Sequence, residues 1–412
     1  MDLQEAMKKQ NDVALLLVGK VISAVAKHSN LVFSPALINS VLTMTAATTE
    51  TETLRSFILS FLKSSSTDEL NAVFREIASV ILVDGSKRGG PKISAVNGVW
   101  IEKSFSCNPE WKDLFENFFK ATFSQVDFRS KCLERESYIS YSMSASILIC
   151  IYVFFGSVLV VDFVIMVFVV LKAEEVRMEV NSWASRHTNG LIKSVLPHGS
   201  VTDETIWIYG NALYFKGAWE EKFNKSMTKR KPFHLVNGKQ VHVPFMKSYE
   251  RQYIGVYNGF KVLRLPYRQG DNDTSRQFSM YIYLPDENDG LDNLVEKMTS
   301  TDGFLDNHIP SWTVEVGDFR IPKFKIEFGF KASSVFDFDL GVSLYQKALV
   351  EIDEKGTEAA AATYMVGNKV SLCSRRHTPL RIDFVADHPF FFMIREDKTG
   401  TVLFAGQIFD PS

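Results

Sequence analysis

The stretch Glu354-Lys-Gly-Thr-Glu-Ala-Ala-Ala-Ala-Thr363 is the most informative part of this chain of 412 residues. After Gly356 it is a run of small side chains. In an extended strand, side chains alternate, so one face of the run carries only small residues, namely Thr357, Ala359, Ala361 and Thr363. Such a face can enter a packed sheet without overfilling a core. Local propensity instead favours a short surface helix capped by Thr357, because alanine is a strong helix former and is depleted in strands.

The composition is that of a globular protein. Hydrophobic residues make up 46% of the chain and charged residues 23%, which is enough to bury a large core. The net charge of −2 argues against a nucleic-acid binder. The cysteines are far apart and show no metal or redox spacing, so we expect free thiols in a reducing compartment. They are Cys107, Cys132, Cys150 and Cys373.

The N-terminal segment does not have the pattern of a secretory signal. Acidic residues precede its first apolar stretch, and Lys20 interrupts the apolar run from Val13 to Ala26. A secretory signal needs a basic start and an uninterrupted apolar segment. We therefore predict an amphipathic first helix and an intracellular protein, in the cytoplasm or the nucleus.

The order of patterns along the chain predicts an α+β fold. Up to Phe118 the pattern is mostly helical, with a strand candidate at 93–101 and a helix opened by Asn108-Pro109. From Thr205 onward the pattern is typical of strands, at 206–215, 240–246, 261–265, 278–284, 384–394 and 402–409. Helices first and strands later, without regular alternation, favour α+β over a doubly wound sheet. No repeat or linker divides the chain, so we predict one domain over residues 1–412.

Residues 147–171 break this pattern, because they form an apolar run with a single charge, Asp162. By hydropathy alone the run is a transmembrane candidate, since about twenty apolar residues at roughly −0.4 kcal/mol each outweigh one aspartate at roughly +3 kcal/mol. The alternative is a segment that is foreign to the fold.

Motifs for catalysis and cofactor binding are absent from the sequence. There is no nucleophile elbow, zinc-protease motif, phosphate-binding glycine loop or dinucleotide fingerprint. The histidines show no metal-ligand pattern, and His388 is expected to be a hydrogen-bonded core residue. The basic runs 229–231 and 375–377 are expected to be solvated loops. We therefore expect no enzyme, no metal, no cofactor and no bound ligand.

Four separated stretches form a recognisable combination, namely Asn30-Leu-Val-Phe-Ser-Pro35, Val180-Asn-Ser-Trp-Ala-Ser-Arg-His-Thr-Asn-Gly-Leu-Ile192, Asn211-Ala-Leu-Tyr-Phe-Lys-Gly-Ala-Trp-Glu-Glu-Lys-Phe223 and Phe384-Val-Ala-Asp-His-Pro-Phe-Phe-Phe-Met-Ile394. Together they resemble the serpins, and the plant serpins in particular. The resemblance implies the serpin fold, in which a helical N-terminal part packs on three mostly antiparallel sheets and a reactive-centre loop is exposed.

The resemblance also implies roles for particular residues. The hinge of the reactive-centre loop would be Glu354, Lys355, Gly356, Thr357, Glu358, Ala359, Ala360, Ala361, Ala362 and Thr363. In serpins the cleaved loop inserts as a new strand into the main sheet, called sheet A. The breach, where insertion begins, and the shutter, where the sheet opens, would contain Trp219, Ser34 and Asn211.

The implied activity is inhibition of a serine-type endopeptidase by a suicide-substrate mechanism, with cysteine proteases as a second target class. The protease forms an acyl-enzyme with the loop. Loop insertion then distorts the protease, driven by stored strain. The inhibitor itself supplies no catalytic residue.

The spacing of the family places the scissile bond. Seventeen residues counted from Glu354 end at Val370, which makes Val370–Ser371 the reactive bond. Valine suggests an elastase-like target, whereas a slip of one residue to Lys369 suggests a trypsin-like one.

The chain also departs from the family pattern. Residues 132–172 interrupt a junction that is nearly continuous in serpins, so we interpret them as a retained intron or gene-model artefact rather than a membrane anchor. In the shutter, Leu37 replaces a serine and Gln346 a histidine, so the polar network there is rebuilt or lost. The segment 335–344 is short, and residues 48–51 replace a glycine-containing turn.

The second hypothesis is therefore a non-inhibitory serpin-fold binding protein with a defective shutter, and the third a membrane-tethered form. Family analogy also offers an extracellular location.

Overall fold

The computed structural model describes residues 2–129, 172–357 and 381–412. The chain divides into two compact units that are both built from separate stretches of sequence. Unit 1 comprises Met1–Ala95, Ala212–Asp337 and Gln346–Ser412, and unit 2 comprises Val96–Asn211 and Phe338–Tyr345. Most of the hinge partners discussed below belong to unit 1.

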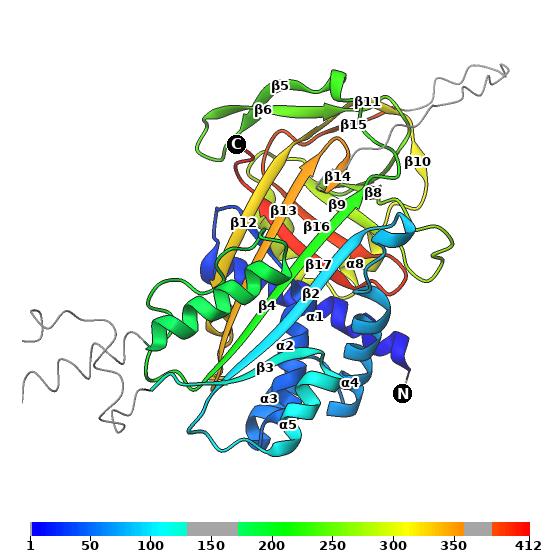
Figure 1. Cartoon of the computed structure of the whole chain (residues 1–412). Coiled ribbons are helices and arrows are strands. Elements are labelled where there is room, and N and C mark those ends of the chain that lie inside the picture. Colours follow the sequence, from blue (N-terminus) through cyan, green and yellow to red (C-terminus); the bar gives the residue numbers. More distant parts are fainter. Residues whose placement is uncertain (1, 130–171, 358–380) are drawn as a thin grey trace, which may run out of the picture. The chain divides into compact units, whose positions relative to one another are not determined.

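The N-terminal part of unit 1 is helical (Figure 1). The predicted amphipathic first helix is present as α1, whose N-terminus is capped by the Asp2 carboxylate and which buries Val13, Leu17 and Val21. The helices of this unit pack against each other and, through α1 and α2, against strand β17. Their bounds are α1 Leu3–Val25, α2 Pro35–Thr48, α3 Glu52–Phe61, α4 Thr67–Glu76, α7 Leu291–Ser300 and α8 Phe304–Asn307, with short turns at Ile77–Ile81, Ser86–Arg88, Lys225–Met227 and Ala332–Val335.

A seven-stranded sheet forms the centre of the unit 1 core. Its order is β1-β17-β16-β9-β8-β7-β10, and all its pairs are antiparallel. The central strands are almost wholly buried, because apolar residues occupy both of their faces. The bounds are β1 Leu31–Phe33, β7 Gln252–Tyr257, β8 Phe260–Pro266, β9 Phe278–Pro285, β10 Thr313–Val314, β16 Phe390–Glu396 and β17 Val402–Ile408.

A four-stranded sheet of unit 1 has the order β15-β11-β6-β5, with β11 and β15 parallel and the other pairs antiparallel. The bounds are β5 Lys229–His234, β6 Gln240–Lys247, β11 Val316–Pro322 and β15 Ile382–Val385. The basic run Lys229–Lys231 lies on the edge strand β5, so the expectation of a solvated loop was wrong for this run. Exposed lysines are tolerated here because they protect a sheet edge from pairing with other chains.

The prediction of a single strand over 384–394 is also wrong, because the segment forms the end of β15 and most of β16 with a break between them. The chain leaves the four-stranded sheet after Val385 and enters the seven-stranded sheet at Phe390. Pro389 has no N–H to donate to a ladder, which favours a break at this point. His388 is 6% exposed in this connection, with Nε2 2.8 Å from the Pro285 carbonyl and Nδ1 3.1 Å from the Asp387 carboxylate. It is thus the hydrogen-bonded core histidine that the sequence predicts.

The third sheet is the main sheet, in which β2, β4 and β13 contribute residues to both units. Its order is β12-β13-β14-β4-β2-β3, and β13 also pairs directly with β4. The bounds are β2 Lys92–Glu102, β3 Ala121–Val126, β4 Trp207–Ala218, β12 Phe324–Lys331, β13 Ser343–Asp353 and β14 Gly356–Thr357.

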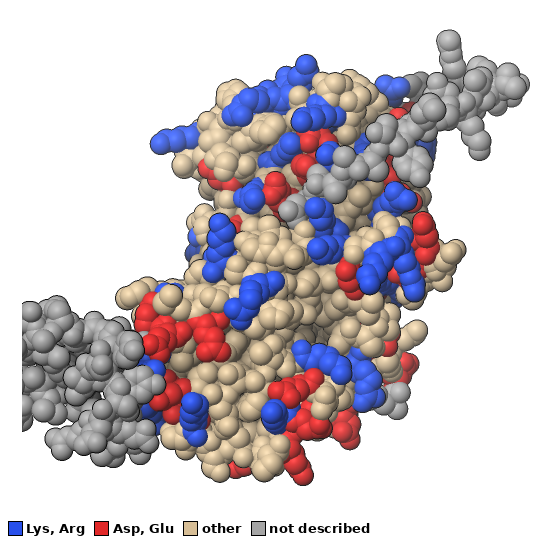
Figure 2. Space-filling model, in the orientation of Figure 1, with Lys and Arg blue, Asp and Glu red and all other residues tan. Residues whose placement is uncertain are grey.

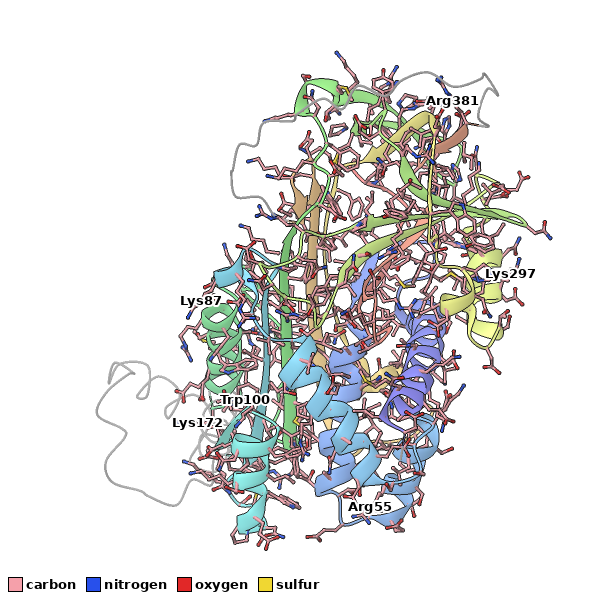
Figure 3. The ribbon with its side chains drawn as sticks, turned by 90° about the vertical axis from the view of Figure 1, so that its right-hand side faces the viewer. Arg55, Lys87, Trp100, Lys172, Lys297 and Arg381 are labelled. Carbon is pink, nitrogen blue, oxygen red and sulfur yellow. The ribbon has the colours of Figure 1, made fainter. Side chains whose placement is uncertain are left out.

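Unit 2 contains a helix packed on the main-sheet residues of the same unit. Residues 172–187 are helical, and the helix is followed by Asn189 and Gly190 in the left-handed conformation. Its Trp183 packs edge-to-face on Trp100 of β2, with ring centroids 5.0 Å apart. Trp100 is labelled in Figure 3. A Cβ at Gly98 would lie 2.3 Å from the Trp100 ring, so this glycine makes room for the tryptophan pair. The unit also contains α5, Pro109–Asp113, and a π turn at Leu114–Phe118.

The fold is α+β with three sheets, as the sequence predicts; most of its helices lie in the first half of the chain, whereas α7 and α8 follow β9. Within the described ranges, no helix is both long and apolar enough to cross a membrane. Residues 147–171, the transmembrane candidate of the sequence, lie outside those ranges.

Candidate functional site

The first residues of the expected hinge form a strand rather than a helix. Gly356 and Thr357 make up β14, which lies between β13 and β4. Thr357 pairs with Ile352 on one side and Gly217 on the other, both antiparallel. At this end the main sheet therefore already accepts an additional strand, and β13 pairs directly with β4 elsewhere.

The turn into β14 depends on a glycine. Gly356 has φ of +144°, and a Cβ at this position would lie 2.0 Å from the Gly217 carbonyl oxygen. The Asp353 carboxylate accepts hydrogen bonds from the backbone N–H groups of Lys355 (2.7 Å) and Gly356 (3.2 Å). The aspartate thus stabilises a tight turn that directs the chain back between the two strands.

A hydroxyl pair holds the Thr357 side chain inside the sheet. Thr357 is 2% exposed, and its Oγ1 lies 2.7 Å from the hydroxyl oxygen of Tyr267. Burial raises the pKa of Tyr267, so the phenol stays neutral and can share a hydrogen bond with the threonine. The Tyr267 ring also stacks on Trp219, with centroids 4.7 Å apart and planes 17° apart.

Trp219, the expected breach tryptophan, contacts the chain just before β14. Its backbone N–H donates to the Lys355 carbonyl, and its indole Nε1 donates to the Asp353 carbonyl, both at 2.9 Å. The structure thus brings Trp219 together with the start of the hinge. The two bonds and the stacking on Tyr267 join β4 and the β13–β14 turn.

Glu354 forms a buried ion pair at the same place. Its carboxylate lies 2.8 Å from the Lys323 ammonium and accepts a 2.7 Å hydrogen bond from the Thr228 hydroxyl. Burial works to raise the pKa of Glu354, but the hydrogen bonds from Lys323 and Thr228 outweigh it and hold the pKa below its ordinary value. The Glu354 carbonyl also accepts from the N–H of Phe223 at 2.9 Å.

At the expected shutter, the side chain of Gln346 makes a polar connection to Ser34. Gln346 on β13 accepts a 2.8 Å hydrogen bond from the Ser34 N–H and donates a 3.0 Å bond to the Ser34 carbonyl. The Ser34 hydroxyl accepts from the Leu37 N–H at 3.3 Å and caps helix α2. A polar connection through Gln346 is therefore present at the expected shutter.

Asn211, the remaining residue of the expected shutter, is fully buried on β4 and belongs to unit 2, whereas Trp219 and Ser34 belong to unit 1. The hinge residues Glu358–Thr363 and the expected bond residues Lys369, Val370 and Ser371 lie outside the described residues.

Sequence reasoning missed the partners that hold the hinge. Tyr267, Lys323 and Thr228 are separated from their partners by 90, 31 and 126 residues, respectively. None of them lies in a motif, so no local signal could have revealed them. The part of the chain that the structure describes contains no cluster of three or more potential metal ligands. The arrangement holds and positions a chain segment.

Comparisons with known proteins agree with this geometry. A family model described as "Serpin (serine protease inhibitor)" matches residues 8–142 and 167–411. The chain is 65% identical over 412 residues to Serpin-Z2 of Arabidopsis thaliana, covering 100% of this chain and 91% of the relative. It is 62% identical over 415 residues to "Probable non-inhibitory serpin-Z5" of the same plant, covering 100% and 86%. The solved structure of Arabidopsis AtSerpin1 in its native stressed conformation is similar with a TM-score of 0.80 and 43% identity, covering 100% of this chain and 99% of that one.

The chain therefore belongs to the serpin family, and it has close relatives among plant serpins. The family is one of protease inhibitors and not of proteases, which is consistent with the expectation that this chain is not an enzyme. The three-sheet fold with its helices is the serpin fold, and the main sheet is its sheet A.

Proposed function

We propose that this protein inhibits a serine endopeptidase as a suicide substrate, by inserting its cleaved reactive-centre loop into sheet A. The observation that carries the proposal is β14, because the first hinge residues already occupy a strand position between β13 and β4. Insertion of the loop would then extend a strand that is already paired, and the first pairing step would not be needed. Each further residue would add backbone hydrogen bonds on both sides.

The position of Thr357 supports a register for the inserted strand. Its side chain faces the core, where it meets Tyr267. Because strand side chains alternate, Ala359, Ala361 and Thr363 would follow on the buried face of the inserted strand. Ala360 and Ala362 would lie on the opposite face. A large charged side chain on the buried face would therefore stop insertion.

For the reactive bond we propose Val370–Ser371, which makes an elastase-like protease the first target class to test. Lys369–Val370 is the alternative bond, and it points to a trypsin-like protease. Cysteine proteases that act through a thiolate form a comparable acyl-enzyme and are the second class.

A non-inhibitory function is the second candidate. One relative, 62% identical, carries the description "Probable non-inhibitory serpin-Z5". In this chain, the two hydrogen bonds between Gln346 and Ser34 connect β13 to the start of helix α2. If this connection holds the sheet closed for longer than the acyl-enzyme survives, the loop would be cleaved as an ordinary substrate.

The test is to mix the purified chain with elastase-like and trypsin-like proteases and to look for a covalent complex on denaturing gels. An SDS-stable complex and a rise in thermal stability after loop cleavage are expected. Cleavage without a complex and without a rise in stability would rule out insertion and support the second candidate.

A matched pair of variants separates insertion from general effects on the loop. Ala361→Arg should abolish the complex and turn the protein into a substrate. Ala360→Arg adds the same charge one residue earlier and should leave the complex. Equal behaviour of the two variants would contradict the proposed register.

We further propose that residues 132–172 are foreign to a single serpin domain that comprises the rest of residues 1–412. The family model matches on both sides of residues 143–166, which lie within this segment. Sequencing transcripts across codons 131–173 tests the idea, and a major message that retains the segment would contradict it. An intracellular location remains our proposal, tested by imaging a fluorescent fusion of the full chain.

A further inference from the structure

Lysine and arginine side chains gather over β5 and β6 at the top of the molecule as drawn in Figure 2. On one face of the four-stranded sheet they surround a pocket of about 430 Å³. Its cationic walls are Lys229 and Lys231 of β5, Lys247 of β6 and Arg320 of β11. Here we call these four residues the basic pocket.

The register of the strands explains why these side chains share a face. Arg320 lies opposite Lys247 in the β11–β6 pair. Lys229 lies opposite Phe245 in the β5–β6 pair, and Lys231 and Lys247 are each two residues from this pair. Residues opposite each other or two apart point to the same face of a sheet. The basic pocket is thus built by three strands of one sheet.

The positive charge of the pocket is only partly compensated. Asp318 is its single carboxylate, and it lies 2.8 Å from Arg320 and 3.9 Å from Lys247. Among the residues that the structure describes, neither Lys229 nor Lys231 forms an ion pair. Three net positive charges therefore surround one hollow in a chain whose total charge is −2.

Two further features favour a bound anion over simple solvation. The Nε–H of Arg320 is buried and has no acceptor within the described part of the chain, so the guanidinium is not fully satisfied by protein groups. Ser226 and Tyr249 also line the pocket, and the Tyr249 hydroxyl can donate a hydrogen bond to an anion, whereas the Ser226 hydroxyl already donates to Asn224.

We propose that the basic pocket binds a compact polyphosphate group. Lysine ammonium groups bind phosphate as point charges, and several of them are needed to balance a multiply charged anion. A hollow of this size is in the range of small-ligand sites, which favours a compact ligand over an extended chain. Such a group can be part of a free polyphosphorylated molecule or of a phosphorylated lipid headgroup.

The pocket is connected to the strand that follows the reactive-centre loop. Arg320 pairs with Val385 of β15, and β15 starts one residue after Arg381, which is labelled near the top of Figure 3. β15 anchors the C-terminal side of the loop, and β11 is its partner strand. A ligand bound to Arg320 would therefore contact the strand that pairs with β15. The binding site itself does not depend on the proposed inhibitory function.

The test is calorimetric titration of the full chain with sodium tripolyphosphate. Saturable binding that weakens with added salt is expected, because exposed charges are screened. Lys231→Glu should weaken it about tenfold or more, since it reverses a charge at the pocket. Arg230→Glu is the matched control, because it makes the same charge change on the neighbouring residue, which lies on the other face and lines a different pocket with His242. This control should change binding by less than about threefold.

The outcomes distinguish the proposal from its competitors. Equal weakening by Lys231→Glu and Arg230→Glu would overturn the proposal, because the anion would then respond to net charge alone. Two further probes distinguish the source of the phosphate group. Inositol hexakisphosphate represents a free polyphosphorylated molecule, and phosphatidylcholine vesicles containing a phosphatidylinositol bisphosphate represent a lipid headgroup. Binding of either probe supports the site. The proposal would also be overturned if no phosphate probe bound to the chain while the Lys231→Glu variant formed the protease complex more slowly. That result would assign the surface to a protein partner. Unchanged thermal unfolding of each variant shows that folding is intact.

Discussion

Replacing Tyr267 by phenylalanine tests whether the hydroxyl pair holds the start of the hinge inside sheet A. The two oxygens are 2.7 Å apart, and both residues are at most 2% exposed. Removing the phenol hydroxyl leaves the buried Thr357 hydroxyl without this partner, which costs about 1 to 3 kcal/mol. The phenylalanine ring can still stack on Trp219, so packing should change little.

A double-mutant cycle isolates this bond from other effects. Thr357→Val keeps the volume of the side chain and leaves the Tyr267 hydroxyl unpaired instead. The double variant has no unpaired hydroxyl, so it should be more stable than the sum of the single losses predicts. The expected interaction energy is about 0.5 to 3 kcal/mol.

The assay is urea unfolding of the native protein, followed by tryptophan fluorescence, since Trp219 stacks on the altered ring. The reasoning is refuted if the single losses simply add in the double variant. It is also refuted if Tyr267→Phe costs less than about 0.5 kcal/mol, because a buried hydrogen bond of this geometry should contribute more.

Three further changes probe the same region. Gly356→Ala should destabilise the native protein by about 1 to 3 kcal/mol or more, because φ of +144° disfavours any side chain, and a lower melting temperature would report it. The pKa of Glu354 is held below its ordinary value, so the ion pair with Lys323 contributes stability above the ordinary glutamate pKa and loses it as the pH falls through the lowered pKa. The advantage of the wild type over Glu354→Gln in urea midpoint should therefore be constant near neutral pH and shrink below about pH 4.5; an advantage that grew on acidification would contradict the assignment. Gln346→Ala removes both bonds to Ser34 and should lower stability by about 1 to 3 kcal/mol while raising the rate of protease complex formation, measured by stopped-time gels; an unchanged rate would mean that the shutter does not limit insertion.

Much of the fold could be predicted from local pattern. The strand candidates at 240–246, 261–265 and 278–284 match β6, β8 and β9 within one residue at each end. These segments are rich in β-branched and aromatic residues and are bounded by turn residues. The pattern does not report which sheet a strand joins. For that reason the run 384–394 was predicted as one strand although it serves two sheets.

The site could be predicted only in part. Local propensity favours a helix at the small residues after Gly356, whereas the resemblance to serpins implies an inserting strand, and Gly356–Thr357 form a strand in the structure. What holds it there depends on Tyr267 and Lys323, which lie far away in sequence, and periodicity carries no information on such pairs. The basic run 229–231 was assigned to a loop because charged residues are depleted in strands, but an edge strand tolerates them.

The described contacts that hold the reactive-centre loop end at Thr357 on one side and resume at Arg381 on the other. Val370 lies 13 residues beyond Thr357 in the sequence, so its identity is remote from the anchoring contacts. If Val370–Ser371 is the reactive bond, as we propose, the residue that a protease recognises is separate in sequence from the residues that hold the hinge. Under that proposal, an exchange of residue 370 would change the target protease and leave the described hinge contacts in place.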